Sequence, residues 1–182
     1  MKFSDLSLTL VIVFCFAAFS PSSGDDCVYT VYVRTGSIIK GGTDSVIGLT
    51  LFNGYDERVE VADLEAWGGL MGPSHDYFER GNLDIFSGRG RCLSGPFCAM
   101  NLTSDGSGPH HGWYCNYVEV TYTGAHIPCF QQLFKVEQWL ARDAPPYQLN
   151  AFRDGCDWSG SSGGNGPNGR EAHDHGPLRS AA

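Results

Sequence analysis

The chain has little positive charge and no basic cluster. Its 182 residues include 12 Lys and Arg against 20 Asp and Glu, which gives a formal net charge of −8 at pH 7. Proteins that bind nucleic acid usually present clustered Lys and Arg, and simple electrostatic attachment to anionic lipids needs the same. The composition therefore argues against a nucleic-acid partner. Any contact with a membrane would need apolar side chains or a bridging cation.

A long apolar segment is also missing from the chain after its first 24 residues. These read MKFSDLSLTLVIVFCFAAFSPSSG: one early lysine, an apolar run from Leu10 to Phe19, then small residues. That is the layout of a secretory signal peptide, and the run is shorter than the about 20 residues of a membrane span. We predict a signal peptide over residues 1–24 and a secreted or endoplasmic reticulum protein beginning at Asp25. A retained N-terminal anchor is the alternative.

The signature motifs of common hydrolases are absent as well. The chain has no Gly-x-Ser-x-Gly, no His-Glu-x-x-His and no reactive-cysteine signature. An enzyme would have to use His110 and His111, with Asp105 or Asp76, as an acid–base or metal cluster. Adjacent histidines in a strand-like setting point to opposite faces, so they cannot easily share a ligand sphere. We therefore predict that the chain is not an enzyme.

Cysteines are plentiful. One of the seven, Cys15, lies in the predicted signal peptide. The other six are Cys27, Cys92, Cys98, Cys115, Cys129 and Cys156. An even count in a secreted chain indicates disulfides, although sequence cannot choose among the possible pairings. Cys92 and Cys98 flank the turn LSGPF, which favours a local bridge between them.

Asn101-Leu102-Thr103 is a sequon for N-glycosylation. The secretory route would expose it to the glycosylation machinery, so Asn101 is a candidate modification site. The alternative is that the sequon lies in a strand and is used only partly or never.

The remaining pattern is that of an all-β protein. Short segments such as CVYTVYVRTG, VIGLTLFNG and GWYCNYVEVTYTG alternate apolar and polar residues between Gly and Pro turn signals. No long segment has helical periodicity, DERVEVADLEAW is ambiguous, and CFQQLFKVEQWLAR is expected as the final strand. We predict an antiparallel β-sandwich over residues 25–156. Residues 157–182, rich in Gly, Ser and Asn, are expected to form a flexible, disordered tail in which His173 and His175 could bind a metal loosely.

Alternation within GWYCNYVEVTY makes a specific prediction about one cysteine. It places Tyr114, Val118 and Val120 on one face of the strand and Cys115 on the other face, with Glu119. Because that second face carries the glutamate, we expect Cys115 to face solvent and to be unpaired.

Several segments taken together resemble the PLAT (lipoxygenase homology) domain: YTVYVRTG with GGTDSVIGLTL, YFERGNLDIFSG, SDGSGPHHGWYCNYVEV and FKVEQWLA. Their order and spacing match the family over residues 27–141, and the chain is similar to small plant proteins made of a signal peptide and one such domain. The resemblance implies a sandwich of two four-stranded sheets without catalytic machinery. It also implies a module that binds a lipid membrane surface or a protein partner. Such a module would act in the apoplast or the endoplasmic reticulum lumen, in stress or developmental responses. A domain that binds only proteins, without lipid or calcium, is the alternative.

The resemblance points to candidate contact residues. In the family, the tryptophan at the strand mouth, here Trp113, lies near loops that can meet a membrane or a partner; the alternative is that it packs under the neighbouring loop. The segment EAWGGLMGPSHDYFERG carries apolar side chains that are common binding anchors but could equally cover the core. They are Trp67, Leu70, Met71, Tyr77 and Phe78.

Some PLAT domains bind calcium at loops grouped on one end of the sandwich, so the resemblance also implies a candidate site. Backbone and side-chain oxygens of three loops would supply the ligands that Ca²⁺ prefers. The candidates are Gly42, Thr43, Asp44, Asn53, Asp56 and Asp105. Lys40 stands where calcium-binding members can carry an acidic residue, and its ammonium would oppose a dication. The alternative is that these aspartates only stabilise turns.

Overall fold

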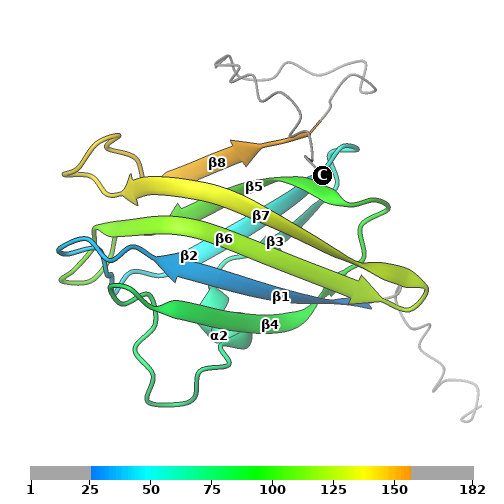
Figure 1. Ribbon diagram of the computed structural model, residues 1–182, viewed down its shortest axis with the longest axis horizontal. Coiled ribbons are helices and arrows are strands. Elements are labelled where there is room, and N and C mark those ends of the chain that lie inside the picture. The colour runs from blue at the N-terminus through cyan, green and yellow to red at the C-terminus, as the bar shows by residue number, and fades with distance from the viewer. Residues whose placement is uncertain (1–25, 157–182) are drawn as a thin grey trace, which may run out of the picture.

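The computed structural model (Figure 1) describes residues 26–156, and the predicted signal peptide and tail lie outside them. Its strands are β1 (Asp26–Thr35), β2 (Ile47–Asn53), β3 (Arg58–Val61), β4 (Leu83–Arg91), β5 (Phe97–Ser104), β6 (Trp113–Gly124), β7 (Ile127–Leu140) and β8 (Asn150–Asp154). They form two four-stranded sheets with the orders β4-β1-β6-β7 and β3-β2-β5-β8. All pairings are antiparallel. This confirms the predicted sandwich.

Period-two alternation builds the core between the two sheets. In β1 the side chains of Tyr29, Val31 and Val33 are buried, while the residues between them are more exposed. Leu49 and Leu51 of β2 close the core from the opposite sheet. Successive side chains of a strand point to opposite faces, so each sheet contributes one apolar face.

The ambiguous segment DERVEVADLEAW forms two elements, β3 and the short helix α2 (Leu64–Gly68). β3 ends at Val61, and Asp63 caps the start of the helix, because its Oδ1 accepts a hydrogen bond from the Ala66 N–H at 3.0 Å. Within residues 26–156, no helix is long and apolar enough to cross a membrane. The segment CFQQLFKVEQWLAR lies largely in β7, but it does not close the domain, because β8 follows and pairs with β5.

The expected Cys92–Cys98 bridge is wrong. Cys92 pairs with Cys27 and Cys98 pairs with Cys156, at Cα–Cα distances of 5.0 and 4.9 Å. The physical reason is topological: Cys92 directly follows β4 of one sheet, whereas Cys98 lies in β5 of the other. Two disulfides in a small domain are consistent with an oxidising compartment.

Cys115 is unpaired, as predicted, but it is buried rather than solvent-facing. The pairing of β6 with both neighbours shifts by one residue around Asn116. Such a bulge leaves one residue unpaired and changes the phase of the strand. Trp113 and Cys115 therefore share the inward face with Val118 and Val120, although strict alternation would separate them.

Candidate functional site

Four loops gather at one end of the sandwich, at the left of Figure 1. They are residues 36–46 after β1, 69–82 before β4, 105–112 before β6 and 141–149 after β7. Antiparallel order brings them together, because Arg34 pairs with Leu83, Trp113 with Leu140 and Ile47 with Ser104. We call this region the loop end.

Hydrogen bonds fix the Gly-Thr-Asp loop against its neighbours. The Thr43 hydroxyl donates to the His110 carbonyl at 2.7 Å, and the Thr43 N–H donates to the Phe78 carbonyl at 3.2 Å. Gly42 is required because a Cβ there would lie 2.9 Å from the Arg80 backbone nitrogen. Three loops distant in sequence are thereby held together at this point.

A buried carboxylate holds the loop before β4. Asp84 is fully buried, and its Oδ2 accepts the Phe78 N–H at 2.8 Å while its Oδ1 lies 2.6 Å from His75 Nε2. A buried carboxylate is costly unless it is hydrogen-bonded in this way. These contacts lie on both sides of Asp76 and directly before Glu79, and so they set the positions of both acidic residues.

An acidic cluster results, formed by Asp44, Asp76 and Glu79. One carboxylate oxygen of each lies within 4.8 Å of the others. The His110 Nδ1 atom lies 3.0 Å from Asp44 Oδ2 at the edge of the cluster. Asp44 was predicted as a calcium ligand, whereas Glu79 was not predicted and Asp76 was a candidate only for an enzyme. No local pattern links residue 44 to residues 76–79.

Three other predicted ligands lie outside this cluster. Asp105 is at the loop end, but its Oδ1 accepts the backbone N–H groups of Val46 and Ser107 at 3.1 and 2.9 Å. These bonds favour the charged form and lower the pKa of Asp105, with the Ser107 backbone bond contributing most. It therefore stabilises a turn, which was the alternative interpretation.

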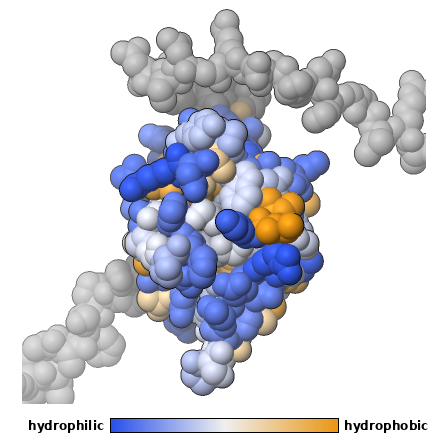
Figure 2. Space-filling model, turned by 90° about the vertical axis from the view of Figure 1, so that its left-hand side faces the viewer, coloured by the Kyte–Doolittle hydropathy of each residue, from blue (hydrophilic) through white to orange (hydrophobic). Residues whose placement is uncertain are grey.

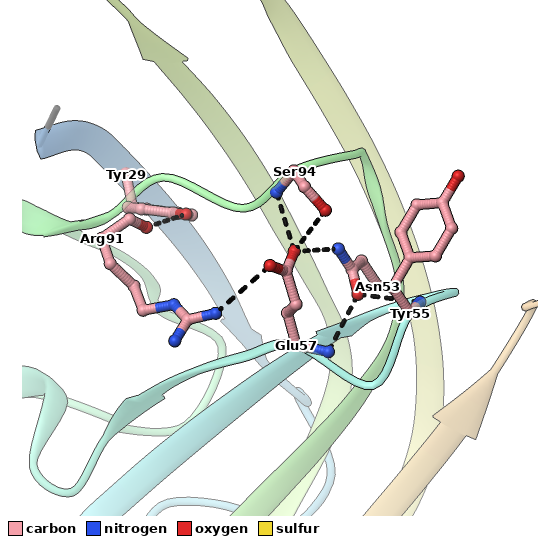
Figure 3. A network of polar contacts seen from close by, with 6 residues as sticks. All are labelled: Tyr29, Asn53, Tyr55, Glu57, Arg91 and Ser94. Atoms are coloured by element: carbon pink, nitrogen blue, oxygen red, sulfur yellow. Dashed lines mark hydrogen bonds and ion pairs between the residues drawn. The ribbon is translucent and has the colours of Figure 1, made fainter. Parts of the chain in front are cut away.

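Asn53 and Asp56 lie at the opposite end of the sandwich, so they cannot share a site with Asp44. The length of β2, about 3.3 Å per residue, separates them. Asn53 is buried, and its Oδ1 accepts the Tyr55 and Glu57 N–H groups at 3.0 Å each. Figure 3 shows that it belongs to a turn network with Glu57 and Ser94.

The predicted contact role of Trp113 is wrong, because its side chain is 0% exposed. The indole Nε1–H donates to Thr35 Oγ1 at 3.0 Å, and the ring packs edge-on against Phe78 at a centroid distance of 5.5 Å. Trp113, the first residue of β6, therefore packs in the core directly beneath the loop end.

The segment after β3 divides between core and surface. Tyr77 and Phe78 are buried, and Trp67 packs over Gly88, where a Cβ would lie 2.4 Å from the indole. Leu70 and Met71 are 59% and 39% exposed. Of the predicted contact residues in this segment, Leu70 and Met71 are exposed large hydrophobic side chains.

The loop end also presents an apolar tip that sequence analysis missed. Ile39 is 80% exposed and its neighbour Ile38 40% exposed. Figure 2 looks onto this end and shows a compact hydrophobic patch on an otherwise hydrophilic face. The sequence shows two consecutive isoleucines within a loop. They indicate contact residues only when their exposure is also known.

A groove of about 720 Å³ opens beside this tip. Lys40 and Arg80 line it from the β1 and β4 side, and Trp139 and Asp143 from the β7 side. The groove therefore offers both signs of charge and an aromatic ring. His111 also lines it, with Nε2 lying 3.9 Å from Asp143 Oδ1.

Comparison with known proteins agrees with this architecture. The PLAT/LH2 domain model matches residues 29–152. The chain belongs to the PLAT/LH2 domain family. It is 56% identical to PLAT domain-containing protein 2 of Arabidopsis thaliana over 83% of this chain and 82% of the relative. It is 67% identical to PLAT domain-containing protein 3 of the same plant, over 57% of this chain and 100% of the relative.

More distant likeness extends to animal proteins. A segment covering 63% of this chain is 29% identical to 5% of the human lipoxygenase homology domain-containing protein 1. Among solved structures, coral 8R-lipoxygenase, an enzyme described as activated by calcium via a C2-like domain, matches with a TM-score of 0.49 and 20% identity. That match covers 69% of this chain and 16% of the lipoxygenase chain.

Proposed function

We propose that this PLAT domain is a non-catalytic module of the secretory pathway that docks on lipid membrane surfaces through its loop end. The observation that carries the proposal is the apolar tip: Ile39, 80% exposed, lies next to Ile38, 40% exposed, in the loop after β1. Burial of one such side chain contributes about 1.5–3 kcal/mol. The groove beside it offers Lys40 and Arg80 to a lipid phosphate and Asp143 with Trp139 to a headgroup ammonium.

One apolar tip gives only weak attachment, and stable membrane binding generally takes two signals. The acidic cluster fits the second. Asp44, Asp76 and Glu79 supply hard carboxylate oxygens close together, the donor type that Ca²⁺ prefers. Calcium held there would offset the charge of an acidic chain, net −8, against lipid phosphates. A role in plant stress or developmental responses, which the resemblance to small plant PLAT proteins implies, is the broadest part of the proposal.

Flotation of the mature domain with liposomes tests this function, in millimolar calcium and again in excess chelator. We expect calcium-dependent flotation that falls strongly in Ile39→Ser and in Asp44→Asn. Leu133→Ser is the matched control, because Leu133 is an aliphatic side chain, 55% exposed on β7 away from the loop end. Equal flotation of the Ile39 and Leu133 variants would contradict docking by the loop end.

A protein partner is the second candidate, favoured by Leu70 and Met71, which are exposed just after α2. Aromatic and methionine side chains are common interface anchors. If the domain does not float in either condition, we expect Met71→Ala to reduce capture of a secretory partner without loss of folding.

A further inference from the structure

The outer face of the β3-β2-β5-β8 sheet carries two aromatic rings in contact. The Phe52 and Phe152 ring centroids lie 6.0 Å apart at an interplanar angle of 67°. Phe52 pairs with Ala99 of β5, and directly opposed residues share a face. Ala99 is nevertheless 0% exposed, as expected for a small residue directly opposite the Phe52 ring. We call Phe52 and Phe152 the aromatic platform; Phe152 is 48% exposed.

The sequon asparagine lies beside this platform. Asn101 is the cross-strand partner of Phe152 on β8 and of Thr50 on β2. Side chains of such partners begin about 4.5–5.5 Å apart on the same face. Thr103, two residues on, shares that face. Both sequon side chains are therefore on the outer surface of a central strand, where they are half-buried rather than enclosed.

The hydrogen bonds of Asn101 leave its attachment atom available. Its Oδ1 accepts from Asn150 Nδ2 at 3.4 Å. Among residues 26–156, Nδ2 of Asn101 donates no side-chain hydrogen bond that would be lost on modification. A strand location, which could have argued against use of the sequon, is thus compatible with a glycan in the folded domain.

We propose that Asn101 carries an N-linked glycan whose first sugar packs on the aromatic platform. The faces of aromatic rings are electron-rich, so the C–H groups of a pyranose ring suit them. The proposal goes beyond membrane docking and concerns another surface. Side chains stand roughly perpendicular to a sheet, so the glycan projects from the sheet and leaves the loop end open.

The attachment chemistry needs a lipid-linked oligosaccharide diphosphate, the co-reactant class available on the secretory route. Nδ2 of Asn101 forms a bond to the anomeric carbon of the first sugar. The anomeric C–O bond to the diphosphate breaks, the diphosphate leaves with that electron pair, and Nδ2 loses one proton. Transfer to the extended chain, before β5 pairs, avoids any steric conflict with the neighbouring strands.

Intact mass measurement on the full chain, expressed in a secretory plant host, tests occupancy. Peptide-N-glycosidase should remove the mass of one glycan from the wild type. Asn101→Gln and Thr103→Ala should show no such loss, whereas Thr103→Ser, which keeps the sequon, should match the wild type. A wild-type protein that the enzyme leaves unchanged would overturn the proposal.

Thermal unfolding then tests packing on the platform. Removal of the glycan should lower the Tm of the wild type by about 2–4 °C. It should lower the Tm of Leu133→Ser, a surface control on the other sheet, by the same amount. In Phe152→Ser, removal of the glycan should change the Tm much less. An equal loss in the Phe152 variant, or none in the wild type, would show that the sugar does not pack on the rings.

Discussion

Trp113 shows how one side chain can serve the loop end without touching anything outside the protein. Its indole fills the core between the sheets, and its single polar atom is matched by the hydroxyl of Thr35, which is itself 0% exposed. A buried polar group without a partner costs about 1–3 kcal/mol. The pair therefore fixes the start of β6 to the end of β1, from which two of the loops depart.

Trp113→Phe should consequently lower the free energy of unfolding by about 1–3 kcal/mol, because it leaves the Thr35 hydroxyl unpaired and a gap in the core. Denaturant unfolding measures this change. Trp113→Phe with Thr35→Val should recover part of the loss, since both polar groups are then absent. Flotation of the folded Trp113→Phe variant should equal that of the wild type; a selective loss of flotation would mean that the indole contacts lipid.

At the scale of single elements, alternation predicted the strands well but could not locate irregularities. The inward phase of β1 follows directly from its sequence, whereas the bulge at Asn116 reverses the phase within β6. Nothing in NYV marks that shift, because it depends on pairing with β1 and β7. The disulfides were unpredictable for the same reason: their sequence separations are 65 and 58, so only the sheet arrangement decides them.

A hydrogen-bond network at the β2–β3 turn, at the end of the sandwich opposite the loop end, predicts that the stability of the domain depends on pH. Glu57 Oε2 accepts hydrogen bonds from the Ser94 hydroxyl and N–H at 2.6 and 2.8 Å and from Asn53 Nδ2 at 2.6 Å (Figure 3). These bonds, those from Ser94 first, lower the pKa of Glu57 from its ordinary value of 4.5. A carboxyl group whose pKa is lowered in the folded state stabilises the fold at pH values above its ordinary pKa. This stabilisation is lost as the pH falls through the pKa of the folded state.

Glu57→Gln should therefore destabilise the domain more at pH 7 than at pH 3. Denaturant titrations at the two pH values measure the difference. Glu60→Gln is the control, because Glu60 is an exposed residue of β3 in the same region, and its effect should be small at both pH values. An equal loss for Glu57→Gln at pH 7 and pH 3 would contradict a role for its charge.

At the scale of the whole molecule, the sandwich keeps its candidate functional surfaces apart. The loop end carries the apolar tip, the groove and the acidic cluster, and the outer face of one sheet carries the sequon. The family resemblance in the sequence predicted that loops would meet at one end. It could not say which side chains protrude there, because exposure of Ile39 and burial of Trp113 depend on how four separate loops pack.

The most direct test is the depth of the loop end in a bilayer, measured with a nitroxide label on Ile39→Cys in a Cys129→Ser background. Cys129 is exposed and would react. Cys115 is buried, and burial raises the pKa of its thiol, so it stays unlabelled in the folded protein. With liposomes and calcium, the label at position 39 should become protected from a water-soluble relaxant and more accessible to oxygen, while a label at Leu133→Cys should not change. A label at position 39 that stays water-accessible on bound protein would contradict docking through this end.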